Sequence, residues 1–322
     1  MQENAVVNET TDFFKESAPQ PDNTPHKAAR TAKNGKTSKI VSLTIIYAIL
    51  VLYAVVIIFP FTMVLLTSFK TPVDAANPQF ELFPANGYTL DGYKNVFTFY
   101  LDGNAIDKTP GLLKGLFNTL LYIIPPTFLG LMTSSMAAYA FAKLRFRLKN
   151  IMYAFLLATM MIPGAITIAP TFSIYDTLGW IDTPLPLMIP GMFGAAACVF
   201  FMRQFFTGIP DSILEAAKLD GVGFIGIFIR IMVPLSMPAF IAQGLLGFIG
   251  GYNDYFGPLI YLQSEELYTL QIALRLFADQ RGVDEPNTVM AGTLIALLPT
   301  LIIYFIAQDF FIEGIAASGV KG

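Results

Sequence analysis

Residue types that carry out catalysis are present in this sequence, but their positions do not assemble a catalytic site. The Gly35–Thr37 tripeptide ends like a phosphate-binding loop, yet Arg30 stands where the leading glycine of that loop is needed. The single histidine, His26, lies in a polar N-terminal segment, and the single cysteine, Cys198, lies in an apolar stretch. We therefore expect no catalytic residue, no metal site and no cofactor bound by this chain.

Polar side chains inside apolar stretches are better candidates for chemistry, because an unpaired polar group in lipid is costly. These residues are Asn118, Tyr122, Gln243, Tyr252, Asn253, Asp254 and Tyr255. The last four fall within about one helical turn, so they are a candidate lining of a polar cavity, with rings to stack on sugars and oxygens to bond hydroxyls. For Asn118 and Gln243, a hydrogen bond that only holds helices together stays open as the alternative.

A polar segment between two apolar stretches, residues 211–234, has the pattern of a docking helix. Ser212 and Glu215 have the spacing of a capping box, and Gly221 is placed to end the helix in the left-handed conformation. Small side chains on this helix would allow the backbone of another protein to approach closely. Apolar anchor residues and a polar rim complete the pattern of a docking helix. The small residues are Ala216 and Ala217, the anchors Ile213 and Leu219, and the rim Lys218 and Asp220.

The composition predicts that these candidates sit in a membrane protein. Hydrophobic residues make up 54% of the 322 residues and charged residues 13%, and the mean hydropathy is +0.58. This chain has too little polar surface to cover a soluble globule. Six stretches reach the length of about 20 residues that a helix needs to cross a bilayer. They are Ile40–Leu66, Asn118–Ala142, Ile151–Ser173, Leu185–Phe206, Ala239–Leu262 and Thr288–Phe311.

The connections orient these stretches by their charge. Basic residues crowd the segment 27–39 and the short connection 143–149, whereas the connections after the first, third and fifth stretches have no positive bias. We therefore expect both termini and residues 211–234 in the cytoplasm. Residues 1–39 are expected to be a disordered basic tail resting on anionic headgroups, and not a cleaved signal peptide. The pairs Pro163–Gly164 and Pro190–Gly191 predict bent helices.

The segment 215–234 resembles a known loop. Glu215-Ala-Ala, then Gly221, then Ile231-Met-Val-Pro234 is similar to the cytoplasmic loop in the integral membrane subunits of binding-protein-dependent ABC transporters. Val233 stands where leucine is commoner. In that family the loop is a coupling helix that sits in a cleft of the ATPase subunit, so the resemblance implies that role for residues 212–221.

Two further matches point to carbohydrate importers. The end of the chain, Phe311-Ile-Glu-Gly314 and then Gly319, Val320, Lys321 and Gly322, resembles the tail of a maltose-type permease subunit with six spans. In that subfamily the tail reaches into the ATPase dimer. Residues 252–259 resemble the fifth span of the same permeases, in which Trp-Asn-Asp is usual and Tyr252 replaces the tryptophan here.

The resemblance implies an all-α, polytopic membrane protein of the type I ABC importer fold, with six transmembrane helices and a cytoplasmic coupling helix. Its parts are a tail over 1–39, a permease domain over 40–311 and a C-terminal tail over 312–322. The expected partners are a second permease, a cytoplasmic ATPase dimer that binds ATP and Mg, an extracytoplasmic solute-binding protein, a sugar or oligosaccharide and the lipid membrane, with no nucleic acid. The expected location is a bacterial or archaeal inner membrane.

An alternative from another class is a secondary transporter or channel that works alone. That class needs ionisable residues within the spans for ion coupling. The spans contain few of them, chiefly Asp254 and Arg203. Purification with or without an ATPase separates the two classes.

Overall fold

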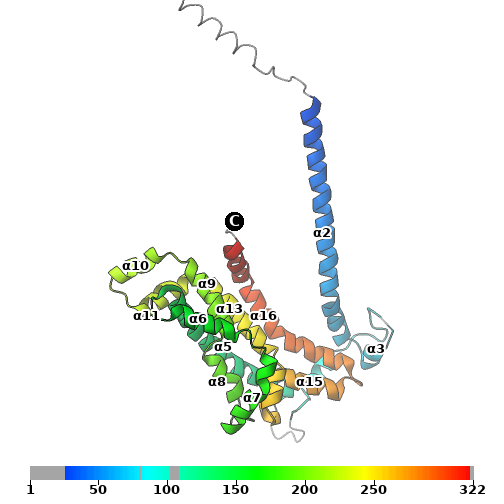
Figure 1. Cartoon of the computed structure of the whole chain (residues 1–322). Helices are drawn as coiled ribbons and strands as arrows, with labels where there is room; N and C mark the ends of the chain where they lie inside the picture. The colour runs from blue at the N-terminus through cyan, green and yellow to red at the C-terminus, as the bar shows by residue number, and fades with distance from the viewer. Residues whose placement is uncertain (1–25, 80, 102–108, 320–322) are drawn as a thin grey trace, which may run out of the picture. The chain divides into compact units, whose positions relative to one another are not determined.

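The computed structural model describes the backbone of residues 26–79, 81–101 and 109–319, and the side chains of residues 40–79, 81–101 and 109–308. The regular secondary structure of these residues is helical, apart from one isolated bridge between Lys70 and Tyr88, which confirms the all-α prediction (Figure 1). In chain order the elements are α2 (His26–Ser68), α3 (Pro72–Ala76), α4 (Asp91–Val96), α5 (Gly111–Lys143), α6 (Lys149–Thr159), α7 (Gly164–Thr177), α8 (Leu185–Met192), α9 (Ala196–Gly208), α10 (Asp211–Leu219), α11 (Phe224–Ile227), the π-helix η1 (Phe228–Met232), α12 (Val233–Leu235), α13 (Met237–Tyr252), α14 (Phe256–Tyr261), the 3-10 helix η2 (Glu265–Leu267), α15 (Leu270–Arg281) and α16 (Pro286–Gly319).

The chain divides into two compact units, Met1–Thr62 and Met63–Gly322. In the first unit, α2 begins at His26, whereas a disordered segment was predicted as far as residue 39. Adding turns to an existing helix costs far less than nucleating a new one, so the apolar helix continues into its polar flank. Each side chain from Ile40 to Phe61 is exposed within this chain. A helix that is apolar all round suits lipid or another membrane subunit.

Six membrane spans fit the helices. Four segments are long and apolar enough to cross a membrane, and two bent pairs make six if each pair is one span. The pair α6–α7 bends by 95° at the break that Pro163 predicted. The bounds predicted for the fifth span, Ala239–Leu262, were wrong at both ends. The helices of this span begin at Phe224, bend by 82° before Met237 and end at Tyr252.

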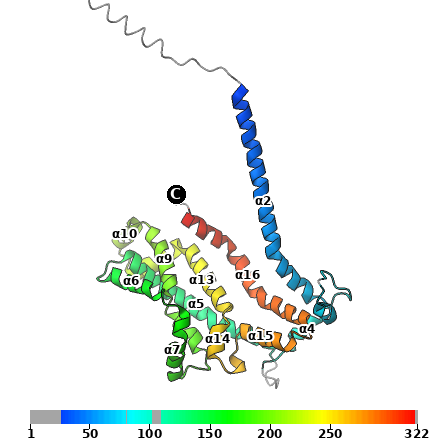
Figure 2. The same cartoon turned by 45° about the vertical axis from the view of Figure 1, so that its right-hand side comes forward.

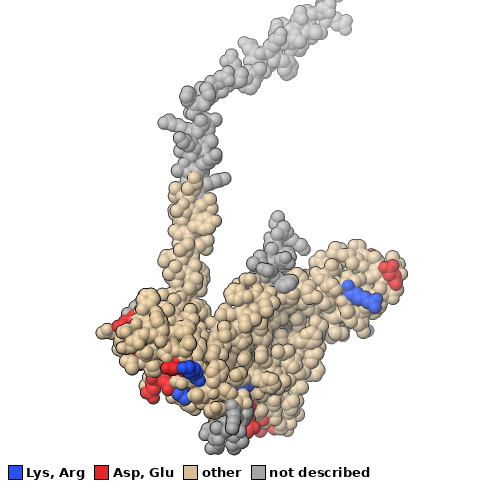
Figure 3. Space-filling model, turned by 180° about the vertical axis from the view of Figure 1, so that it is seen from behind, with Lys and Arg blue, Asp and Glu red and all other residues tan. Residues whose placement is uncertain are grey.

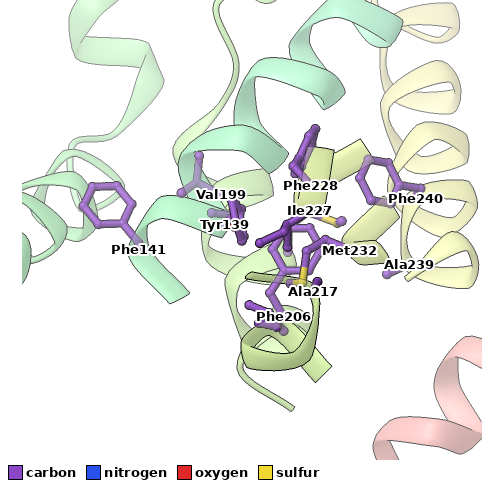
Figure 4. Close-up of a cluster of buried hydrophobic side chains, with 13 residues drawn as sticks. Tyr139, Phe141, Val199, Phe206, Ala217, Ile227, Phe228, Met232, Ala239 and Phe240 are labelled. Atoms are coloured by element: carbon purple, nitrogen blue, oxygen red, sulfur yellow. The ribbon is translucent and has the colours of Figure 1, made fainter. Parts of the chain in front are cut away.

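Two hydrophobic cores lie along α5 in the second unit. The outer core packs the first half of α5 against α4, α13, α15 and α16, the helices labelled in Figure 2. Leu270 and Phe277 in this core are almost completely buried. The inner core packs the second half of α5 against α9, α10, η1 and the start of α13. Phe206, Ile227 and Met232 meet at its centre and are 0% exposed (Figure 4). One helix thus connects both cores.

The π-helix η1 follows α11 near the start of the fifth span, within the inner core. Its first and last residues, Phe228 and Met232, are both buried, as is the preceding Ile227. The ring of Phe228 lies 5.8 Å from that of Tyr139 on α5, centroid to centroid. The wider turn of a π-helix, in which bonds run from residue i to i+5, allows these bulky side chains to face one neighbour.

Between the two cores, the backbones of α5 and α8 approach closely through glycine. A Cβ atom added at Gly130 would lie 2.2 Å from the carbonyl oxygen of Gly191. The hydroxyl of Thr133 donates to the carbonyl oxygen of Met192 at 3.0 Å, and the N–H of Ala195 donates to Ser134 Oγ at 3.0 Å. These two bonds satisfy backbone groups that the break between α8 and α9 would leave unpaired in the membrane.

Asp182 holds the connection between α7 and α8 to the segment that follows α14. The carboxylate of Asp182 accepts hydrogen bonds from the N–H groups of Gln263 and Ser264 at 2.9 and 2.7 Å and from the Ser264 hydroxyl. These bonds, that of the hydroxyl first, hold the pKa of Asp182 below its ordinary value. Helix α15 packs one apolar face inward, because Ile272 and Phe277 are buried.

The glycine crossing of α5 and α8 gives a prediction about stability. Gly130→Ala should lower the melting temperature of the purified protein, because overpacking costs about 1–3 kcal/mol. The control is Gly250→Ala in α13, where an added Cβ meets nothing within 4 Å and alanine favours the helix by about 1 kcal/mol. Equal melting temperatures for the two variants would contradict the close crossing.

Candidate coupling surface and translocation path

The first turn of α10 is fixed to the end of α5 by one lysine. Lys143 Nζ donates to the carbonyl oxygen of Ile209 at 2.6 Å and to Asp211 Oδ1 at 2.7 Å. The Lys143 side chain is 6% exposed, and that of Asp211 is 75% exposed. The hydrogen bond from Lys143 and its positive charge hold the pKa of Asp211 below its ordinary value. Asp211 also lies in the first turn, where a negative charge favours the helix dipole.

The predicted capping box at this end of α10 was wrong. The residue before the helix is Pro210, and among the described residues no side chain caps the first turn. Ser212 lies inside the helix and, like Glu215, is exposed. Pro210, with an extended backbone, occupies the N-cap position, two residues before the position predicted for Ser212. Lys143, and not a capping box, fixes this end of α10.

The other end of α10 confirms the predicted role of Gly221. Its φ is +80°, in the left-handed region that favours glycine. The N–H of Val222 donates to the carbonyl of Ala217 and that of Gly221 to the carbonyl of Lys218, both at 3.0 Å. This pair of bonds is a Schellman motif, and it reverses the chain directly after the helix.

The two faces of α10 have different surroundings. Leu214 and Ala217 are 4% and 7% exposed and pack into the inner core (Figure 4). Ala217 therefore faces this chain, not the surface predicted for close approach by another protein. Leu219 is 90% exposed and Ile213 40% exposed, so both predicted anchors are on the outer face. The other predicted residues on that face are Ser212, Glu215, Ala216 and Asp220.

A groove of about 570 Å³ lies between α10 and the α5–α6 connection. Arg145, Glu215 and Lys218 contribute charge to it, and Phe224 contributes an apolar wall. In the unit Met63–Gly322, the face seen in Figure 3 carries its charges at the margins with a wide uncharged area between them. A polar end next to an apolar surface is the pattern of a helix end that leaves the membrane.

Two of the candidate path residues lie in the outer half of α5. Asn118 Nδ2 donates to the carbonyl oxygens of Glu266 at 2.8 Å and Tyr268 at 3.0 Å, so it ties α5 to the outer connection. Tyr122 is 3% exposed. Asn118 therefore connects two elements of this chain, and Tyr122 is packed inside it.

The structure does not bring the four residues 252–255 together in one cavity. The ring of Tyr252 is 1% exposed and stacks on Phe248, and its hydroxyl donates to the carbonyl of Ala296 at 2.6 Å. Helix α13 ends at Tyr252, and the exposed Asn253 and Asp254 bond the nearby backbone. Tyr255 is 37% exposed. The prediction of one converging turn was wrong because the helix stops within the cluster.

Gln243 lines a cavity of about 310 Å³ between α5, the α8–α9 break and α13. Thr127 of α5 shares this cavity. Sequence reasoning missed Thr127, because a threonine inside an apolar helix usually bonds its own backbone. Sequence reasoning also missed that Lys143 anchors α10, because the sequence indicates only that this residue is basic. At the C-terminus, Gly319 ends α16, and Val320, Lys321 and Gly322 lie outside the described residues.

Residues 130–316, which include α10 and the inner core, match the family described as binding-protein-dependent transport system inner membrane component. The chain belongs to this family. The arabinooligosaccharides transport system permease protein AraQ of Bacillus subtilis is 35% identical over 226 residues, 70% of this chain and 78% of that protein. The sn-glycerol-3-phosphate transport system permease protein UgpE of Pectobacterium atrosepticum is 31% identical over 243 residues, 74% and 85% of the respective chains.

A solved structure shares the fold of this permease. It is that of a bacterial ABC transporter involved in the import of the acidic polysaccharide alginate, with a TM-score of 0.71 and 24% identity. The likeness covers 85% of this chain and 98% of that one. The resemblance to ABC importer permeases is thus confirmed, and permeases of this family are not themselves catalytic.

The anchoring of α10 by Lys143 can be tested by proteolysis. Lys143→Met removes both bonds of the buried ammonium group, so thermolysin should cleave the segment 209–223 about tenfold faster. Lys218→Met is the control, because Lys218 is exposed and forms no ion pair among the described residues. Equal cleavage rates in both variants would rule out the anchor.

The same anchor has a predicted pH dependence. The pKa of Asp211 is lower in the folded protein than in the unfolded chain. The stability that Asp211 contributes is therefore fully present above the unfolded pKa of about 3.9 and is lost as the pH falls through the folded pKa. The cleavage rate of the wild-type segment should therefore be constant from pH 6 to pH 8. A rise within that range would show that another group controls the loop.

Proposed function

We propose that this permease forms, with a second and homologous permease, the transmembrane path for a sugar or oligosaccharide in an ATP-driven importer. A solute-binding protein delivers the cargo outside, and a pair of cytoplasmic ATPases binds ATP and Mg inside. Closure of the ATPases moves α10, and the movement passes into the membrane helices. Both termini of the permease lie in the cytoplasm, and its residues 319–322 contact the ATPases.

The observation that carries this proposal is the contrast between the two faces of α10. Its inner face is fixed to α5 and to the inner core through Lys143, Leu214 and Ala217. On its outer face, Leu219 exposes 90% of its surface, an unfavourable position for a large apolar side chain in water. A protein cleft that takes up Leu219 would bury this side chain and could push on the helix without detaching it.

The cargo class rests on the relatives. AraQ is named for arabinooligosaccharides, and the transporter of shared fold imports alginate, which is also a carbohydrate. UgpE is named for sn-glycerol-3-phosphate, a small polyol phosphate. All three cargoes carry hydroxyl groups, whose passage through lipid requires hydrogen-bonding partners along the route.

Residues of the outer half and the middle of the spans are the proposed route. Asn253, Asp254 and Tyr255 follow the end of α13 and are exposed in this chain, so they are placed to meet cargo or the second permease. Gln243 lies deeper, in the cavity beside α5. Asn118, Tyr122 and Tyr252 support the outer end of the route by fixing its helices.

A secondary transporter acting alone is less well supported. The guanidinium carbon of Arg203 lies 4.1 Å from the centre of the Tyr153 ring, and Arg203 Nε donates to the carbonyl of Phe141. Asp254 accepts a hydrogen bond from the N–H of Gly257. Because both ionisable groups already bond to nearby parts of this chain, neither is a dedicated binding site for a coupling ion.

Co-purification tests the proposed assembly. Affinity isolation of the permease from its native membrane should recover an ATPase and a second permease in stable proportion. Uptake of sugar into vesicles that contain the purified chain alone would instead establish the stand-alone transporter.

Replacement of Gly221 tests the coupling role. An added Cβ at Gly221 meets nothing within 4 Å, so a side chain fits in the isolated chain and would protrude towards the docked partner. Gly221→Asp should leave membrane insertion intact and reduce ATP-driven uptake at least about tenfold, because a loss of 1.4 kcal/mol at the docked interface is tenfold.

Gly87 supplies a matched control for this substitution. Its φ is +87° and its added Cβ also meets nothing within 4 Å, but it lies in a connection predicted to be outside. Gly87→Asp imposes the same left-handed strain and should retain uptake. Similar loss in both variants would indicate that backbone strain, not docking, is responsible.

A further inference from the structure

A cavity of about 310 Å³ occupies the glycine-rich region between the two cores. It is open on one side and is bounded by α5, by the α8–α9 break and by α13, and Gly130, Gly191 and Gly247 form part of its wall. A Cβ at Gly247 would lie 3.3 Å from Thr127 Cγ2, so the glycine leaves space beside the threonine. The volume is at the lower limit of small-molecule sites, which suits a single sugar ring.

Two polar side chains of the cavity have no hydrogen-bond partner within the described part of the chain. They are the hydroxyl of Thr127, near the middle of α5, and the amide of Gln243 in α13. Their neighbours differ, because Thr133 bonds the backbone of its own helix and of α8, and Ser134 accepts from Ala195. Both side chains are partly exposed at this open cavity, so their polar atoms can meet a hydrogen-bonding ligand.

The cavity has no charged wall. Its lining contains neither a lysine or arginine nor an aspartate or glutamate. Arg203 and Asp254 are held elsewhere, by Tyr153 and by the Gly257 N–H. A phosphate or carboxylate brought into such a site would lose its hydration without gaining a cation, whereas a neutral hydroxyl group needs only the donors and acceptors that an amide and a hydroxyl provide.

We propose that Thr127 and Gln243 form a binding subsite for one ring of a neutral, hydroxyl-bearing sugar on its way through the permease. The proposal rests on the proposed import function and narrows its cargo. Gln243 offers both an amide donor and a carbonyl acceptor, and Thr127 offers one hydroxyl, so a sugar hydroxyl pair can be bound from two helices. Neutral sugars are favoured over anionic cargoes such as sn-glycerol-3-phosphate or alginate.

The test uses the complete transporter, with both permeases, the ATPases and the binding protein, in proteoliposomes. ATP-driven uptake is measured for arabinotriose, lactose and sn-glycerol-3-phosphate. The wild type should import at least one of the two neutral sugars and not the phosphate. Gln243→Leu and the isosteric Thr127→Val should each raise the KM for that sugar about five- to tenfold, the effect of losing one hydrogen bond.

A matched control is Thr167→Val in α7, where the hydroxyl already bonds the carbonyl of Gly164 and the side chain is exposed. It should leave KM unchanged. A purely structural role for Thr127 and Gln243 would lower the amount of assembled transporter and leave KM as it was. If the transporter with Gln243→Leu does not assemble, the KM of the transporter with Thr127→Val decides whether the subsite exists.

The possible outcomes separate the two proposals. Normal KM values in both variants, with active sugar uptake, would overturn the subsite and leave the import function standing. Preferred uptake of sn-glycerol-3-phosphate would overturn the neutral cargo. A complete wild-type transporter that hydrolyses ATP yet moves none of the three solutes by ATP would overturn the sugar import function and the subsite with it.

Discussion

The attachment of α10 to the membrane helices is the constraint on which the proposed mechanism depends. A helix outside the membrane transmits displacement only if it moves together with the helices inside. Lys143 holds its first turn, a Schellman motif ends it, and Leu214 and Ala217 join it to the inner core. Burial of a leucine side chain alone favours this attachment by about 1.5–3 kcal/mol. The outer face can then bind a partner without loosening the inner one.

The permease has two hydrophobic cores, with the glycine crossing of α5 and α8 between them. Close-packed side chains deform little, so a displacement of the inner core is passed along α5 as a whole. At the crossing of α5 and α8, contact is made by glycine backbone and by two hydrogen bonds to the α8–α9 break. Fewer side chains must repack there than within either core. The cavity beside Gln243 lies in this same region.

Sequence patterns predicted those features that depend on one residue's backbone or on mean hydropathy. Gly221 adopts the left-handed conformation, Pro163 lies at a sharp bend, and six spans fit the helices. The patterns failed where a distant residue decided the outcome. Ser212 was expected to cap α10, but Lys143, far away in sequence, fixes that end. Tyr252 was expected in a cavity, but it finds its partner at Ala296 in another helix. Neither contact has a local signal.

The π-helix at Phe228–Met232 makes the inner core sensitive to chain length. Such a turn holds one residue more than an α-helical turn, and here its first and last side chains are both buried. Deleting one residue within it would leave an α-helical turn of about the same rotation. The helix that follows would keep its face, but the inner core would lose one of its bulky side chains. Insertions and deletions are therefore tolerable in the outer connections long before they are tolerable between α10 and α13.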